Sequence, residues 1–307
     1  MNKDLLGLKG VSRAAIGAIL DRAAHYKKVI VSGKKKLTDC AGKSVFLLFY
    51  ENSTRTSSSF DHAAKILGAN SINLSVKNSS VNKGETLIDT GITLAAMGAD
   101  IMVIRHQASG TPKLLADNVT SSVINAGDGS NEHPTQALLD MLTMRERFGR
   151  LKDLKIAIIG DVKHSRVARS NIWGLKTMGA EVTLCAPETL KPAGIEAFGV
   201  RVEDKIEDAA RGADVIMALR MQLERQDSGL IPSVAEYSAF YGINKRVISL
   251  ANKNAIVMHP GPVNRGVEIA SEVMTMPECF IAGQVTNGLA VRMALIKILG
   301  NKEDIGL

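Results

Sequence analysis

The chain has 307 residues, of which 45% are hydrophobic and 22% charged, and its formal net charge is +7 at pH 7. This is the composition of a globular protein, and no segment approaches the roughly 18 to 20 uninterrupted apolar residues of a membrane span. The basic residues are scattered apart from the run Lys34, Lys35 and Lys36, and aromatic residues make up 4%. Small anionic ligands therefore explain the positive charge better than nucleic acid does.

The amino-terminal residues carry a charge of each sign and lack the long apolar core of a secretory signal, so we expect a cytoplasmic protein. The three cysteines, Cys40, Cys185 and Cys279, are widely spaced, which favours buried free thiols over a disulfide framework or a zinc knuckle. The six histidines show no H-x-x-x-H spacing and no neighbouring carboxylate cluster, so we expect no metal site.

Short β-rich runs alternate with helical patterns along most of the chain, which predicts an α/β protein with parallel sheets. In the first half we expect strand 45–50, helix 57–67, strand 71–76, helix 84–97, strand 100–105, helix 112–118 and strand 122–125. A long helix over 134–148 comes next. The second half has strand 155–160, helix 166–178, strand 181–186, helix 206–211, strand 214–218, helix 234–250 and strand 255–258, and the last expected helix covers 287–299.

Two successive sets of four strands predict two doubly wound parallel-sheet domains, joined by the long helix from Pro134 and by a C-terminal return helix. The expected domains are 1–133 together with 288–307, and 134–287. Ligands of such sheets bind beyond the carboxyl ends of the strands. Six residues follow predicted strands or lie in the loops that these strands feed: Ser53, Arg105, His133, Asp161, Arg220 and His259.

The first candidate site is the run Ser53, Thr54, Arg55 and Thr56, where an apolar strand gives way to a helical pattern. Free backbone N–H groups at a helix start, hydroxyl donors and a guanidinium fork can bind one anion together, and phosphate is the natural ligand. The alternative is that Ser53 or Thr54 only caps the helix. The four residues alone leave both interpretations open.

Three further residues suit an anionic or carbonyl ligand. Arg105 at a strand end can be a second anion contact or a surface charge. His133 precedes Pro134 at a helix start, where the helix dipole favours a neutral imidazole that can donate a hydrogen bond to a carbonyl. Gln136 lies one turn later and would face the same pocket. The alternative is an exposed histidine in a helix-capping region.

Three loops complete the candidates. Lys83, in the polar loop 79–86, can add a point charge to a phosphate site or remain solvated. Arg166 and Arg220 belong to loops after neighbouring predicted strands and can clamp a dicarboxylate through bidentate pairs. The loop after strand 155–160 lacks the G-x-G-x-x-G spacing of a dinucleotide site, so we expect no nicotinamide cofactor.

Taken together, these motifs resemble the ordered signature of the transcarbamoylase family over nearly the whole chain. The segments that carry the resemblance are Ser53-Thr54-Arg55-Thr56, Lys83-Gly84-Glu85-Thr86, Arg105-His106, His133-Pro134-Thr135-Gln136 and His259-Pro260-Gly261-Pro262. The segments Arg220-Met221-Gln222 and 259–266 are similar to the aspartate-using branch. The ornithine enzymes carry His-Cys-Leu-Pro and Ser-Met-Gly segments instead, and this chain has neither.

The resemblance implies transfer of the carbamoyl group from carbamoyl phosphate to the α-amine of L-aspartate, an early step of pyrimidine synthesis, without a cofactor. It places carbamoyl phosphate in the domain formed by 1–133 and 288–307 and aspartate in the domain 134–287. The carbamoyl phosphate residues that it implies are Ser53, Thr54, Arg55, Thr56, Ser79, Lys83, Arg105, His133, Gln136, Pro260 and Gly261. The aspartate residues are Lys83, Arg166, Arg220 and Gln222, and the catalytic ones are Arg55, Thr56, Lys83, Arg105, His133 and Gln136.

The resemblance also implies a homotrimer in which the loop with Ser79 and Lys83 reaches into a neighbouring subunit's site. A larger assembly with regulatory chains or with another pyrimidine enzyme is left open, and neither nucleic acid nor a membrane is an expected partner. Two other functions remain as alternatives. One is a transcarbamoylase for another amino acid such as ornithine, and the other is a non-catalytic phosphate-binding member of the fold.

Overall fold

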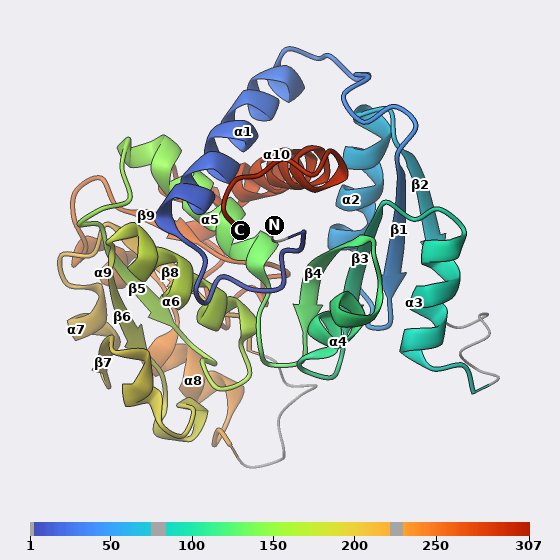
Figure 1. Ribbon diagram of the computed structural model, residues 1–307. Coiled ribbons are helices and arrows are strands. Elements are labelled where there is room, and N and C mark those ends of the chain that lie inside the picture. Colours follow the sequence, from blue (N-terminus) through green and yellow to red (C-terminus); the bar gives the residue numbers. More distant parts are fainter. Residues whose placement is uncertain (1–2, 75–83, 222–229) are drawn as a thin grey trace. The chain divides into compact units, whose positions relative to one another are not determined.

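The computed structural model describes residues 3–74, 84–221 and 230–307, and the chain divides by its internal contacts into two compact units (Figure 1). Unit 1 comprises Met1–Leu142 and Thr286–Leu307, and unit 2 comprises Thr143–Val285. Each unit contains its own parallel sheet, which confirms the predicted class. The division falls within α5 (Pro134–Phe148) and α10 (Ile281–Gly300).

Unit 1 contains a four-stranded sheet with the order β2-β1-β3-β4, and each pair of neighbouring strands is parallel. Residues 45–48 and 101–104 are buried, as is typical of parallel strands covered on both faces. The strands are β1 (Ser44–Phe49), β2 (Asn70–Leu74), β3 (Ile101–His106) and β4 (Ser122–Asp128). Besides α5 and α10, the helices of the described part are α1 (Arg13–Val31), α2 (Thr54–Ile66), α3 (Leu87–Ala96) and α4 (Thr111–Asn118).

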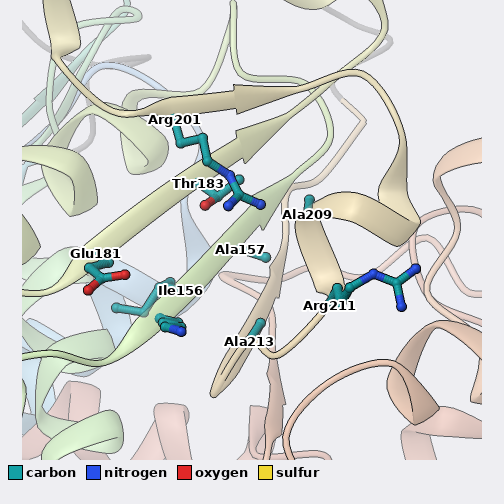
Figure 2. Close-up of a pocket in the computed structure, with 9 residues that line it drawn as sticks. Ile156, Ala157, Glu181, Thr183, Arg201, Ala209, Arg211 and Ala213 are labelled. Carbon is teal, nitrogen blue, oxygen red and sulfur yellow. The ribbon is translucent and has the colours of Figure 1, made fainter.

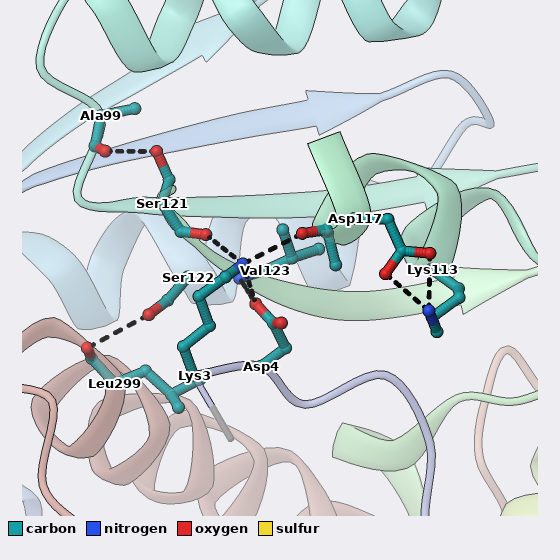
Figure 3. Close-up of polar contacts among 10 residues, drawn as sticks. Lys3, Asp4, Ala99, Lys113, Asp117, Ser121, Ser122, Val123 and Leu299 are labelled. Atoms are coloured by element: carbon teal, nitrogen blue, oxygen red, sulfur yellow. Dashed lines mark hydrogen bonds and ion pairs between the residues drawn. The ribbon is translucent and has the colours of Figure 1, made fainter. Parts of the chain in front are cut away.

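The amino-terminal segment and α10 are both tied to β4 (Figure 3). The Asp4 carboxylate accepts from the Val123 backbone N–H at 2.8 Å, and the Lys3 ammonium donates to the Ser121 carbonyl at 3.0 Å. The Ser122 hydroxyl donates to the Leu299 carbonyl of α10 at 3.4 Å. The two ends of the chain therefore belong to the same unit.

Unit 2 contains a five-stranded sheet with the order β7-β6-β5-β8-β9, again parallel throughout its ladders. Its strands are β5 (Lys155–Ile159), β6 (Glu181–Cys185), β7 (Arg201–Glu203), β8 (Val215–Ala218) and β9 (Ile256–Met258). Its helices are α6 (Arg166–Met178), α7 (Ile206–Ala210), α8 (Val234–Tyr241) and α9 (Lys245–Ser249), with short 3₁₀ turns η3 (Glu188–Leu190), η4 (Ile195–Phe198) and η6 (Val273–Thr275). Strand β7 is a three-residue addition to the predicted set of four.

The predicted single helix over 234–250 is wrong, because α8 and α9 are separate. A Cβ on Gly242 would lie 2.4 Å from the Ser238 carbonyl oxygen, which shows how closely the backbone packs at this break. The Asn244 side chain then caps α9 by accepting from the Val247 N–H at 3.1 Å. A glycine followed by an N-cap residue interrupts the helix despite a continuous apolar pattern.

Two other helices begin three or more residues earlier than predicted, and one was missed. Helix α2 begins at Thr54 rather than at residue 57, and α10 begins at Ile281 rather than at residue 287. Helix α1 was not predicted, although Ser12 caps it by accepting from the Ala15 N–H at 3.1 Å. The start of α2 matters most, because it places the first candidate run inside the helix.

Candidate active site

The run from Ser53 to Thr56 forms the N-terminus of α2, directly after β1. Ser53 occupies the N-cap position, but within the described residues its hydroxyl makes no capping hydrogen bond. Thr54 is already helical, so neither residue acts as the side-chain cap that the sequence left open. Thr54 and Arg55 are exposed whereas Thr56 is buried. Backbone N–H groups of the first turn and a guanidinium are thus available to an anion.

Arg105 lies at the carboxyl end of β3, in register with Phe49 of β1. Its Nη2 donates to Glu51 Oε1 at 2.9 Å, and both side chains are mostly shielded from water. The ladder between β3 and β4 shifts register between Ile104 and His106. Because Glu51 holds the guanidinium, the Arg105 side chain is oriented before any ligand binds.

His106, the next residue, has its imidazole ring tilted against Tyr50 with the ring centroids 5.1 Å apart. Its Nδ1 accepts from the Ala108 backbone N–H at 2.9 Å. Burial of the ring lowers the pKa of His106 from its ordinary value of 6.5. The neutral imidazole is therefore the form that fits this turn.

His133 comes directly before α5 and is 5% exposed, so the alternative of an exposed capping histidine is wrong. Its carbonyl accepts from the Gln136 N–H at 3.0 Å. The Gln136 amide in turn donates to Asp140 Oδ1 at 2.9 Å. Both predicted side chains are thus buried at the start of one helix.

Two buried carboxylates hold the turn before His133. Asp128 accepts from the Gly110 N–H at 2.7 Å and from the Glu132 N–H at 3.1 Å. Glu132 accepts from the Leu8 N–H at 2.7 Å, which attaches the amino-terminal segment to the turn. The position of His133 thus depends on contacts from three separate parts of unit 1.

The order of the sheet brings these groups to one edge. Strands β1, β3 and β4 are consecutive neighbours in unit 1, and all run in the same direction. Their carboxyl ends lead to α2, to Arg105 and to the turn before His133. This arrangement provides a helix N-terminus, a fixed guanidinium and an imidazole at adjacent strand ends, where ligands of such sheets bind.

In unit 2, Arg166 and Arg220 follow the neighbouring strands β5 and β8. Arg166 is the first residue of α6 and is 4% exposed. Asp161 comes after β5 and is fully buried. Its carboxylate accepts from the His164 backbone N–H at 3.2 Å and from the His164 imidazole Nδ1 at 2.8 Å. We infer that Asp161 orders the loop that leads to Arg166.

Glu268 joins the two remaining loops of unit 2. Its carboxylate accepts from the Met221 N–H at 2.8 Å and from the Asn264 N–H at 2.8 Å. In the loop before Asn264, the Gly261 N–H donates to His259 Nδ1 at 2.8 Å, and Gly261 has a φ of 65°, which favours glycine. The loops that carry Arg220 and the predicted Pro260–Gly261 segment are therefore held by one buried carboxylate.

A cavity of about 110 Å³ in unit 2 lies elsewhere (Figure 2). Its lining includes Lys155, Glu181 and Arg201, the first residues of β5, β6 and β7. These are the amino ends of the strands, opposite to the ends that lead to Arg166 and Arg220. The cavity therefore does not belong to the candidate active site.

Three predicted residues, Ser79, Lys83 and Gln222, lie outside the described residues. The described parts hold no group of three His, Cys, Asp or Glu side chains that could bind a metal ion. Across the same residues, no helix is both long enough and apolar enough to span a bilayer. Cys40 and Cys185 are buried free thiols and Cys279 is partly buried.

The sequence interpretation missed Glu51 and Glu268. Glu51 lies two residues before the Ser53–Thr56 run, and an acid beside a predicted anion site is a signal that it has a basic partner. Glu268 lies just past the 259–266 segment and has no signal of its own, because its contact with the Met221 N–H joins it to a loop 47 residues away.

Comparison with protein families gives two matches that together span nearly the whole chain. Residues 3–146 match "Aspartate/ornithine carbamoyltransferase, carbamoyl-P binding domain", and residues 152–299 match "Aspartate/ornithine carbamoyltransferase, Asp/Orn binding domain". The chain belongs to the aspartate/ornithine carbamoyltransferase family.

Within that family, two relatives are named aspartate carbamoyltransferase catalytic subunit. The protein from Ruminiclostridium cellulolyticum is 57% identical over 298 residues, which cover 97% of this chain and 95% of that protein. The protein from Acetivibrio thermocellus is 56% identical over 303 residues, with 99% and 97% coverage.

Solved structures show the same fold. Aspartate transcarbamoylase from Trypanosoma cruzi, in complex with N-(phosphonacetyl)-L-aspartic acid, has a TM-score of 0.88 and 33% identity, covering 96% of this chain and 95% of that one. Ornithine carbamoyltransferase from Thermus thermophilus has a TM-score of 0.86 and 25% identity, with 97% and 99% coverage.

Proposed function

We propose that this protein transfers the carbamoyl group of carbamoyl phosphate to the α-amine of L-aspartate, giving N-carbamoyl-L-aspartate and phosphate. This reaction serves pyrimidine synthesis. The observation that carries the proposal is the 57% identity, over nearly the whole chain, to a protein named aspartate carbamoyltransferase catalytic subunit.

The choice of aspartate over ornithine depends on sequence rather than on fold. The two kinds of solved structure resemble this chain almost equally, with TM-scores of 0.88 and 0.86. Sequence identity separates them, at 33% for the aspartate enzyme and 25% for the ornithine enzyme. Arg220 is present after β8, and a guanidinium suits the extra carboxylate of aspartate and repels the ammonium of ornithine.

For carbamoyl phosphate, we assign the phosphate to Ser53, Thr54, Arg55 and Thr56. The uncapped first turn of α2 and the exposed Arg55 guanidinium support this assignment. The loop that carries Ser79 and Lys83 adds a further cation. Arg55 also neutralises the charge that develops on the leaving oxygen, and the departing phosphate takes the amine proton.

For the carbamoyl group, we assign Thr56, Arg105 and His133 as donors to the carbonyl oxygen and Gln136 as the partner of the amide. The amine attacks the carbonyl carbon through a tetrahedral intermediate whose oxygen is negative, so fixed donors stabilise the transition state. Arg105 is held by Glu51, and His133 by a network of buried carboxylates, which supports the preorganisation that such donors need. The backbone of Pro260 and Gly261 contacts the carbamoyl nitrogen.

For aspartate, we assign the two carboxylates to Arg166, Arg220, Gln222 and Lys83. The positions of Arg166 and Arg220 after neighbouring parallel strands support a shared ligand. We place the protein in the cytoplasm as a homotrimer with active sites shared between subunits.

One assay tests the function against its alternatives. The protein is incubated with carbamoyl phosphate and L-aspartate, L-ornithine or no acceptor, and phosphate release is measured. We expect release that depends on aspartate. Phosphate release that depends on ornithine would point to the other branch of the family. A protein that binds phosphate but releases none from carbamoyl phosphate would be non-catalytic.

A further inference from the structure

Unit 1 contains a buried arginine that is not among the residues assigned to carbamoyl phosphate. Arg292 lies in α10 and is 5% exposed. In the part of the chain that the structure describes, no carboxylate pairs with it, and its Nε is buried without a hydrogen-bond partner. Burying a charge is costly unless something compensates it. A buried cation without a counter-charge therefore suggests that an anion binds nearby.

The contacts of Arg292 lead to α2. Its Nη1 donates to the Ser59 hydroxyl at 2.9 Å, and its Cζ lies 5.3 Å from the centre of the Phe60 ring. Ser59 and Phe60 are three and four residues after Thr56, so all three share one face of α2. The guanidinium thus contacts α2 six and seven residues after the N-cap Ser53, between one and two helical turns along the helix. Figure 1 shows α10 and α2 as neighbours within unit 1.

The packing makes room for this arginine. A Cβ on Gly288, one turn earlier in α10, would lie 2.7 Å from Arg292 Nη1. Burial, together with the positive charge of Arg105, lowers the pKa of Arg292 to about 10, so the guanidinium is still protonated at neutral pH. Arg292 and Arg105 therefore repel each other in the free protein, and an anion bound beside them would relieve that repulsion.

We propose that Arg292 is a positioning residue of the carbamoyl phosphate site: it holds the first turns of α2 through Ser59 and Phe60, and its buried positive charge is balanced by the phosphate when substrate binds. The location of the ligand rests on the proposed function. The role of Arg292 rests on its burial, its missing counter-charge and its contacts with α2.

The test measures the affinity of inorganic phosphate by calorimetry at pH 7. Arg292→Met removes the charge and keeps most of the volume, and we expect it to weaken phosphate binding roughly tenfold. Arg292→Lys keeps the charge and should stay within about threefold of wild type. Should Arg292→Met fail to fold, Ser59→Asp gives a second answer, because it places a carboxylate beside the guanidinium. We expect Ser59→Asp to weaken phosphate binding by a similar factor.

Two controls separate charge from packing. Ser59→Ala removes the hydrogen-bond acceptor and keeps the charge, and exposed Ser58→Asp adds the same charge on the solvent side of α2. Ser58→Asp should bind phosphate within about twofold of wild type. Ser59→Ala should weaken phosphate binding less than Arg292→Met does, because the buried charge and the Phe60 contact remain. In turnover, Arg292→Met should raise KM for carbamoyl phosphate more than it lowers kcat, which a purely structural role would not do.

The outcomes also separate this inference from the proposed function. Wild-type phosphate affinity in Arg292→Met or Ser59→Asp overturns the role of Arg292, even if the enzyme transfers carbamoyl groups to aspartate. Weakened phosphate binding in these variants supports it, even if no acceptor is carbamoylated.

Discussion

Arg55 and Arg105 have different environments although both are assigned to one substrate. Arg55 is exposed at the start of α2, whereas Arg105 is mostly shielded and pairs with Glu51 at 2.9 Å. Arg105 can therefore polarise a carbonyl without reorganising. Arg55 has to become ordered around the ligand, and this ordering is offset by binding the phosphate.

Replacing Arg55 tests its catalytic assignment. Arg55→Ala should lower kcat by roughly a hundredfold or more, because neutralisation of the leaving oxygen is lost. Lys65→Ala is the matched control: Lys65 is an exposed cation of the same helix and pairs with Asp61 at 2.8 Å. Steady-state kinetics of both variants check the prediction. A kcat near wild type for Arg55→Ala would leave Arg55 with at most a binding role.

His106 makes the stability of the protein depend on pH. Its pKa is lowered by burial, so below pH 6.5 the unfolded chain takes up a proton that the folded protein resists. Stability should therefore fall as the pH drops through 6.5 toward the lowered pKa, since protonated Nδ1 can no longer accept from Ala108.

Denaturant unfolding between about pH 5 and pH 8 measures this slope. His106→Gln should flatten it. His25→Gln, a change at an exposed histidine of α1, should leave it intact. An unchanged slope in His106→Gln would show that other groups cause the acid sensitivity.

The positions of strongly apolar strands between clear turns were predictable from the sequence. The first residues of helices that begin in polar stretches were not. Residues 45–48 and 101–104 form continuous buried runs, and β1 and β3 appear where expected. Helix α10 begins six residues before its predicted start, in a polar stretch that includes buried Gln284. There the Gln284 side chain accepts from the His259 N–H at 3.0 Å, a tertiary contact that no local pattern reveals.

The candidate site divides in the same way. Groups at strand ends, such as Arg105, His133 and Arg220, were predictable because parallel topology brings strand ends together. Glu51, Glu268 and Arg292 were not, because their partners come from other parts of the chain. Ser79 and Gln222 were predicted from the family resemblance alone, and Lys83 from its polar loop as well, and all three stay predictions.

The tight packing at Gly242, between α8 and α9, predicts that a change from glycine to alanine destabilises the protein there. The same change at Gly17, in α1, should stabilise it. Gly242→Ala should lower the free energy of unfolding by about 1 to 3 kcal/mol, because the new Cβ meets the Ser238 carbonyl at 2.4 Å. Gly17→Ala, inside α1 with nothing within 4 Å of the new Cβ, should raise it by roughly 0.5 to 1 kcal/mol. Denaturant unfolding of both variants checks the pair. Equal effects at the two sites would contradict the packing described for Gly242.

At the scale of the whole molecule, the proposed trimer predicts complementation between inactive variants. Arg55→Ala and Lys83→Ala should each be nearly inactive as pure proteins. If sites are shared between subunits, mixing them after mild dissociation should restore activity, because some sites then combine an intact Arg55 with an intact Lys83 from the neighbour.

Light scattering on the wild type should give three times the mass of one chain. A monomer that is fully active, or a mixture without any regained activity, would contradict the shared site.

The most direct test of the central claim follows the carbamoyl carbon itself. The wild-type protein is incubated with ¹³C-carbamoyl phosphate and L-aspartate, and the products are followed by ¹³C NMR. We predict that the label appears in N-carbamoyl-L-aspartate in step with phosphate release, and that Arg220→Ala slows this transfer. Label that leaves carbamoyl phosphate without reaching aspartate, or that reaches ornithine when L-ornithine replaces aspartate in a parallel sample, would contradict the account.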